Sequence, residues 1–99
     1  MDIAFARTSI ERLYYEEKIP KNCPVEVVDA FFEVMSYVEA AEDERELRAM
    51  RSLHYEKLKG DRKNEHSLRL WKGWRLTFRI ENKDGKIFLV LDVVDYHRG

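Results

Sequence analysis

The sequence predicts an α+β domain in which N-terminal helices pack on one face of a mainly antiparallel, twisted sheet. Two patterns predict it: apolar residues recur at helical spacing in the first half of the chain and alternate with polar residues in the second half. A chain of 99 residues is long enough to bury one modest core. We therefore expect residues 1–99 to form a single domain.

The first half is expected to hold a short strand and three helices. A strand fits Asp2–Arg7, and a helix fits Ser9–Glu17, preceded by the capping-box pattern Thr8-Ser9-Ile10-Glu11. A longer second helix begins with Pro24 in its first turn and has apolar residues at positions 28, 31, 35 and 38. A short third helix follows a cap at Asp43. Its expected buried residues are Leu47 and Met50.

The second half is organised around a β-hairpin over residues 66–80. With a period of two, one face of both strands is apolar and the other is polar. The expected core residues are Leu68, Leu70, Trp74, Leu76, Phe78 and Ile80. The opposite face carries Ser67, Arg69, Arg75, Thr77 and Arg79. Lys72-Gly73 is the expected turn, with the glycine supplying a positive φ.

A last strand is expected over Ile87–Val94, after the turn Asn82-Lys83-Asp84-Gly85. This segment is almost continuously apolar, which is typical of a strand covered on both faces. We therefore expect it to be a central strand of the sheet. It leads into the terminal residues Asp95-Tyr96-His97-Arg98-Gly99.

Composition excludes several classes of protein. No apolar run approaches the length of a transmembrane span, no secretory signal pattern opens the chain, and the single Cys23 cannot form an internal disulfide. The sequence has no Cys/His cluster at zinc spacing and no glycine-rich phosphate loop. We expect a cytoplasmic protein with no membrane contact, no cofactor and no bound metal.

The net charge of −1 conceals an asymmetry between the halves. Residues 1–50 contain six Lys or Arg against twelve Asp or Glu, whereas residues 51–99 contain twelve against seven. The basic half would carry a working surface, and the acidic helices would face the other way. The ordinary alternative is that helices are rich in Glu and loops are rich in Lys.

A cluster of cations and aromatic residues is expected on the polar face of the sheet. Cations bind phosphates and rings stack on unpaired bases, so the combination fits RNA binding or phosphodiester transfer. Transfer needs a base, an acid and cations where charge grows on phosphorus, and this half lacks the carboxylate cluster of a two-metal nuclease. The candidates are Lys57, Lys59, Arg62, Arg69, Arg75 and Arg79, with His54, His66, Tyr96 and His97 as neighbours.

Some of these residues also have an ordinary interpretation. Arg62 and Arg79 fit solvated charges at the rim of the sheet, and His66 fits an exposed residue at a strand start. His97 is different because the buried strand before it would fix its position close to the end of the chain. For His97 both interpretations stay open.

Four segments of the second half resemble one protein family. They are Leu58-Lys59-Gly60-Asp61-Arg62, Ser67-Leu68-Arg69-Leu70, Trp74-Arg75-Leu76-Thr77-Phe78 and Val94-Asp95-Tyr96-His97. In this order and spacing they resemble the RelE/ParE toxin superfamily, in its plasmid-maintenance-killer or HigB-type branch. The resemblance implies a small RelE-like fold and a type II toxin that cuts translated mRNA on the ribosome. It also implies a helix-turn-helix, HigA-like antitoxin as the partner in a hetero-oligomer.

The resemblance further implies roles for individual residues. Lys59 and Arg75 match basic residues that bind and neutralise the scissile phosphate. Tyr96 and His97 match a terminal pair that follows the acidic Asp95, and His97 would transfer protons. The remaining cations would bind RNA: Lys57, Arg62, Arg69 and Arg79.

The second proton-transfer group has two candidates. At the position where the family can carry a catalytic histidine, this chain has Glu56. His54 lies two residues earlier, on the same side of a regular extended chain. Position favours Glu56 slightly.

Three functions stay open at this point. The first is a metal-independent, ribosome-dependent endoribonuclease that cleaves by attack of the ribose 2′-hydroxyl. The second is a non-enzymatic, ParE-like toxin of the same fold that acts on DNA gyrase. The third is an inactive module retained for antitoxin binding. The terminal sequence Asp95-Tyr96-His97 favours the first.

Overall fold

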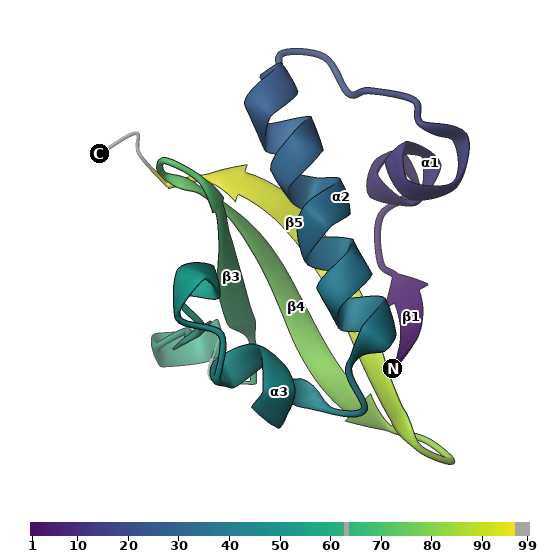
Figure 1. The fold of residues 1–99 in the computed structure, drawn as a ribbon, viewed down its shortest axis with the longest axis vertical. Helices are drawn as coiled ribbons and strands as arrows, with labels where there is room; N and C mark the ends of the chain where they lie inside the picture. Colours follow the sequence, from purple (N-terminus) through teal and green to yellow (C-terminus); the bar gives the residue numbers. More distant parts are fainter. Residues whose placement is uncertain (63, 97–99) are drawn as a thin grey trace.

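One five-stranded sheet forms the centre of the molecule, seen here in a computed structural model that describes residues 1–62 and 64–96 (Figure 1). The strand order is β1-β5-β4-β3-β2. The strands are β1 (Asp2–Phe5), β2 (Glu56–Lys57), β3 (His66–Trp71), β4 (Trp74–Asn82) and β5 (Lys86–Asp95). β1 runs parallel to β5, and every other neighbouring pair is antiparallel. The predicted α+β class with a mainly antiparallel sheet is therefore confirmed.

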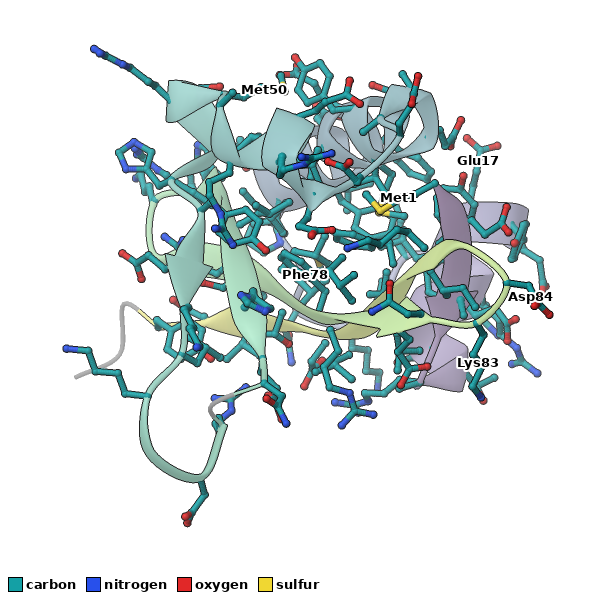
Figure 2. All side chains as sticks on the ribbon, turned by 90° about the horizontal axis from the view of Figure 1, so that it is seen from below. Met1, Glu17, Met50, Phe78, Lys83 and Asp84 are labelled. Carbon is teal, nitrogen blue, oxygen red and sulfur yellow. The ribbon has the colours of Figure 1, made fainter. Side chains whose placement is uncertain are left out.

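The helices gather on one side of this sheet (Figures 1 and 2). They are α1 (Thr8–Glu16), α2 (Val25–Ala40) and α3 (Glu44–Arg48), followed by the 3-10 turns η1 (Arg51–Leu53) and η2 (Gly60–Arg62). The η2 segment projects from the opposite side of the sheet, as Figure 2 shows. We call that opposite side the open face, and its residues on β3 and β4 are Ser67, Arg69, Arg75, Thr77 and Arg79.

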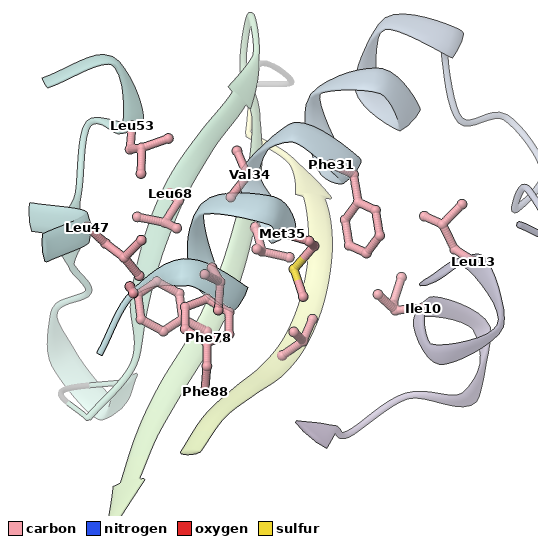
Figure 3. Packing of buried hydrophobic residues seen from close by; sticks show 14 of the residues in the cluster. Ile10, Leu13, Phe31, Val34, Met35, Leu47, Leu53, Leu68, Phe78 and Phe88 are labelled. Carbon is pink, nitrogen blue, oxygen red and sulfur yellow. The ribbon is translucent and has the colours of Figure 1, made fainter. Parts of the chain in front are cut away.

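The core lies between α2 and the sheet (Figure 3). Phe31 and Met35 of α2 are fully buried, as are Leu68, Phe78 and Phe88 of the strands. The rings of Phe78 and Phe88 stack with their centroids 4.2 Å apart. Burial of each such side chain stabilises the fold by about 1.5–3 kcal/mol, so this layer fixes the positions of β3, β4 and β5.

The register of the hairpin confirms the alternation of the two predicted faces, but Leu70, Trp74 and Ile80 are only half-buried, and Ser67 and Thr77 of the polar face are fully buried. Leu68 lies opposite Leu76 and both are fully buried, while Arg69 lies opposite Arg75 on the open face. The prediction for the last strand was partly wrong. β5 has a neighbouring strand on each side, but the helices cover only one of its faces, so Phe88 and Val90 are buried and the alternate residue Leu89 stays half-exposed.

Three local expectations were also wrong, because caps and turns depend on backbone angles that a pattern does not fix. The N-cap of α1 is Arg7 rather than Thr8, and no side chain caps it. In the β3–β4 turn Lys72 has the positive φ, 50°, rather than Gly73. Met50 lies beyond α3 and is only half-buried. The cap at Asp43 is confirmed, because its side chain accepts a hydrogen bond from the Arg45 amide at 2.9 Å.

Candidate active site

Two arginines face each other across β3 and β4 on the open face. Arg69 and Arg75 are paired directly in the strand register, and the next pair along is Ser67 and Thr77. Like charges at directly opposed positions destabilise a sheet unless other groups compensate. The two arginines avoid this repulsion by taking different positions. Arg69 is exposed, whereas the Arg75 side chain is largely buried against the sheet.

The Arg75 guanidinium is held by the strands beside it. Its side chain is only 15% exposed. Its Nε donates to the Ser67 hydroxyl at 2.7 Å, and its Nη2 donates to the backbone carbonyls of His54 and Ser67, the latter at 3.4 Å. Among the described residues Nη1 has no hydrogen-bond partner. Arg75 therefore fixes the entry to β2 and still has one donor group left for a ligand.

Burial lowers the pKa of Arg75, and so does the nearby Arg69, while Glu56 and Tyr96 act to raise it. A guanidinium is charged throughout the biological pH range despite such a shift. The Glu56 carboxylate lies 4.0 Å from the Arg75 Nη2 group. Arg75 is thus a fixed positive charge with the Glu56 carboxylate beside it.

The two candidates for the second proton-transfer role are placed differently. Glu56 lies on β2 opposite Ser67, so its side chain is on the open face, where it is 62% exposed. His54 precedes β2 and has a left-handed backbone with φ of 44°. The expectation that both side chains share one side of a regular strand was therefore wrong. The structure places the Glu56 carboxylate beside Arg75, whereas His54 contributes its backbone carbonyl there.

Tyr96 connects the end of β5 to the η2 segment. Its backbone N–H donates to the Gly73 carbonyl at 2.8 Å, which places it beside the β3–β4 turn. Its hydroxyl accepts a hydrogen bond from the Arg62 Nη1 group at 3.0 Å. Arg62 also pairs with Glu65 at 2.9 Å. Contacts with Tyr96 and Glu65 raise the pKa of Arg62, so this arginine is a tether between two segments rather than a free rim charge.

Lys59 lies at the base of the same projecting segment. It is exposed, and it precedes Gly60, whose φ of +71° is a conformation that other residues adopt only with strain. The Leu58 amide donates to the Glu65 carbonyl at 2.9 Å, and this hydrogen bond joins the two ends of the projecting segment. Lys59 makes no hydrogen bond or ion pair within the described residues, so its ammonium group is available to a ligand.

His97, the predicted proton-transfer residue, lies outside the described residues, which end at Tyr96. Asp95, two residues before His97, is opposite Trp74 at the end of β5. The described part of the chain contains no group of three or more His, Cys, Asp or Glu side chains arranged to hold a metal ion.

Comparison with known proteins identifies the family. The sequence model of the HigB-like toxins, described as RelE-like toxins of the type II toxin–antitoxin system HigB, matches residues 3–97. The chain belongs to the HigB-like toxin family. A solved structure described as a YoeB/ParE toxin from Agrobacterium tumefaciens has a similar fold, with a TM-score of 0.65 at 14% identity over 97% of this chain and 99% of that chain. A search of curated proteins gives no match.

Membership of the HigB-like family makes this chain the toxin of a type II toxin–antitoxin pair, so it has an antitoxin as its partner. The structural likeness supports the RelE-like fold. No helix within residues 1–62 and 64–96 has the length and apolar character needed to cross a membrane.

Two basic residues of this HigB-like toxin lie away from the Arg75 centre. Lys57 is opposite His66 in the register, and His66 is opposite Phe78, so Lys57 is on the helix side of the edge strand. The expectation that Lys57 shares the open face with Arg75 was wrong, because Lys57 follows Glu56 in β2 and successive strand residues point to opposite faces. Arg79 is on the open face, 3.9 Å from Glu81.

The structure also gives His66 a different position from the exposed one expected. It is half-buried and stacks on Phe78, with ring centroids 5.5 Å apart, and it lies 5.4 Å from the Tyr55 ring. Burial lowers the pKa of its imidazole, and the cations of Arg48 and Lys57 lower it further. The alternation that predicts Leu68 as a core residue extends back to position 66, and that signal could have located His66 on the core side.

Proposed function

We propose that this HigB-like toxin is an endoribonuclease that cuts mRNA on the ribosome. The observation that carries the proposal is the pairing of the buried Arg75 guanidinium with the exposed Glu56 carboxylate on the open face. A fixed cation beside a carboxylate supplies the charge stabilisation and part of the proton exchange that phosphodiester transfer requires.

The reaction would be an intramolecular transesterification. The ribose 2′-oxygen attacks the adjacent phosphorus, its proton passes to a base, and the bond from phosphorus to the 5′-oxygen breaks as that oxygen receives a proton. The products are a 2′,3′-cyclic phosphate and a 5′-hydroxyl. His97 exchanges the protons with Glu56 as the second group, and Arg75 and Lys59 stabilise the negative charge that grows on the phosphorane.

Dependence on the ribosome fits the openness of the site. Glu56 and Lys59 are exposed on the sheet and its projecting segment. A site of this kind does not surround a flexible RNA strand, so it offers little of the positioning that accelerates a reaction. The decoding site would hold the mRNA in the reactive geometry, and free RNA would be a poor substrate.

The ends of the RNA products test this function. After induction of the chain in cells, new mRNA 5′ ends are expected to carry a hydroxyl and to appear only in translated messages. A reporter without its start codon is the matched control. Products with a 5′-phosphate and a 3′-hydroxyl, or equal cutting of the untranslated reporter, would contradict the proposal.

The second proton-transfer group can be tested by substitution. Glu56→Gln is expected to lower cleavage by about 100-fold, the lower end for a proton-transfer group, because it keeps the shape and removes the base. His54→Ala is expected to have a much smaller effect, since His54 contributes only its backbone carbonyl to Arg75. Single-turnover cleavage on programmed ribosomes measures both variants. A larger loss in His54→Ala would reverse the assignment.

The antitoxin in this proposal is a helix-turn-helix, HigA-like protein, and the complex is a hetero-oligomer. The cationic groups of the open face invite an acidic partner segment, since complementary charge favours association. The acidic helices on the other side provide a second possible surface. The proposed target places the free toxin in the cytoplasm, where translated mRNA is found.

A further inference from the structure

A notch of about 440 Å³ lies at the edge of the sheet, away from Arg75. β3 begins at His66 opposite Phe78, so the pairings of the described residues leave β4 without a neighbour on this side from Arg79 onward. Figure 2 shows β4 running on from Phe78 toward the turn at Lys83 and Asp84. The notch is lined by Lys57, Asn64, His66, Arg79, Ile80 and Glu81.

Two buried nitrogen atoms of residues that line this notch lack hydrogen-bond partners among the described residues. The Nδ1 atom of His66 and the Nε atom of Arg79 are both buried, and neither has a hydrogen-bond partner among the described residues. Buried polar groups in proteins are nearly always paired, so an orphaned one needs a structural or functional explanation. Both atoms are enclosed by the protein, so a ligand in the notch would contact the Lys57 ammonium and the outer nitrogens of Arg79.

The charges of the notch favour an anion. Lys57 and Arg79 are both cationic, and the imidazole of His66 is close enough to Lys57 for that charge to lower its pKa. Glu81 is the opposing charge, but its 3.9 Å pair with Arg79 is exposed on both sides, and such pairs are weak. The Arg79 side chain is 42% exposed, so its outer nitrogens can reach a ligand in the notch.

We propose that this notch is a phosphate-binding subsite separate from the catalytic centre, formed by Lys57, His66 and Arg79. Resting on the proposed function, its ligand is a backbone phosphate of the RNA some nucleotides away from the cleaved bond. Arg75 and Arg79 are on the same face of β4, four residues apart, which is about 13 Å at the rise of a strand. One RNA strand crossing the open face contacts both.

A phosphate in the notch comes from RNA or from free inorganic phosphate, and NMR titration of the purified chain separates the two. Inorganic phosphate and a 2′-O-methyl oligoribonucleotide, which lacks the attacking hydroxyl, are each added while the His66 imidazole and the Arg79 Nε–H signals are followed. Shifts of both signals with the oligonucleotide support the RNA subsite. Shifts with inorganic phosphate alone retain the anion site and overturn the assignment to RNA. No shift with either ligand overturns the subsite itself.

Substitutions give an independent measurement through salt dependence. Lys57→Gln and Arg79→Gln are each expected to weaken oligonucleotide binding several-fold and to reduce the slope of log affinity against log salt by about 0.7, the value for one phosphate contact on a single strand. Lys83→Gln, the same charge change in the exposed β4–β5 turn, is the matched control and should leave the slope unchanged. His66→Phe keeps the ring on Phe78 and removes the nitrogen, and it should weaken binding without lowering stability.

Equal slopes for Lys57→Gln, Arg79→Gln and Lys83→Gln would overturn the subsite, because the effect would then be one of overall charge. These measurements do not depend on cleavage. If the chain cuts translated mRNA but the notch residues show no response, the subsite is overturned and the proposed function stands. If the chain does not cut mRNA but the notch residues respond to the oligonucleotide, the subsite stands and the proposed function is overturned.

Discussion

Replacing Arg75 by alanine is expected to lower mRNA cleavage by about 100-fold or more, the scale on which a single donor to a developing oxyanion acts. The same substitution should lower the free energy of unfolding. Arg75 donates to the Ser67 hydroxyl and to two backbone carbonyls, and its side chain is only 15% exposed. Leaving a buried acceptor such as Ser67 without its donor costs about 1–3 kcal/mol, which denaturant unfolding would detect.

Arg69→Ala is the matched control for this experiment. Arg69 lies opposite Arg75 in the strand register but is exposed, so its loss removes a cation and few contacts. It also removes a charge that lowers the pKa of Arg75. The stability of Arg69→Ala should be unchanged or slightly raised. Its mRNA cleavage should fall only a few-fold, because single surface charges contribute little.

Arg75→Lys separates the two roles of Arg75. An ammonium group keeps the charge but cannot donate in the planar, forked arrangement that links Ser67 and His54. Cleavage by Arg75→Lys should therefore remain well below that of the native chain while exceeding that of Arg75→Ala. Cleavage by Arg75→Ala at the level of Arg69→Ala, once both are fully folded, would assign Arg75 to structure alone.

Local periodicity was sufficient to predict most of the fold. Leu68, Leu76 and Phe78 are buried because alternation along a strand and the need for one apolar face leave few other arrangements. The helix of residues 25–40 was predicted because its apolar stripe spans about three turns. These features depend on residues that are close together in the sequence, so the pattern of residues is enough to predict them.

Other features depend on contacts between distant segments. The left-handed backbone at His54 and its hydrogen bond to Arg75 join residues 21 positions apart. The link between Arg62 and Tyr96 spans 34 positions. No periodic pattern encodes such contacts, so the sequence located the cations but not their partners. Arg62, which fitted a solvated charge, links η2 to Tyr96, and the half-buried Arg75 links β4 to Ser67 of β3 and to His54 before β2.

The remaining large effect is expected at His97, which follows directly after Tyr96. His97→Ala is expected to lower cleavage by about 100-fold or more, within the range for a general acid or base. An imidazole is the side chain suited to both giving and taking a proton near neutral pH. The Tyr96 amide is bonded to Gly73 and its hydroxyl to Arg62, so the residue before His97 is anchored to the β3–β4 turn and to η2.

Arg98→Ala, at the next position, is the matched control for a change at the chain terminus, and it should cleave within a few-fold of the native chain. Growth arrest and mapped mRNA 5′ ends, measured at equal expression, distinguish the two variants. If His97→Ala arrested growth as strongly as the native chain and the mRNA stayed intact, proton transfer by His97 would not explain toxicity. The ParE-like alternative, in which the same fold poisons a protein such as DNA gyrase, would then account better for the chain, and Arg75 and Tyr96 would belong to its binding surface.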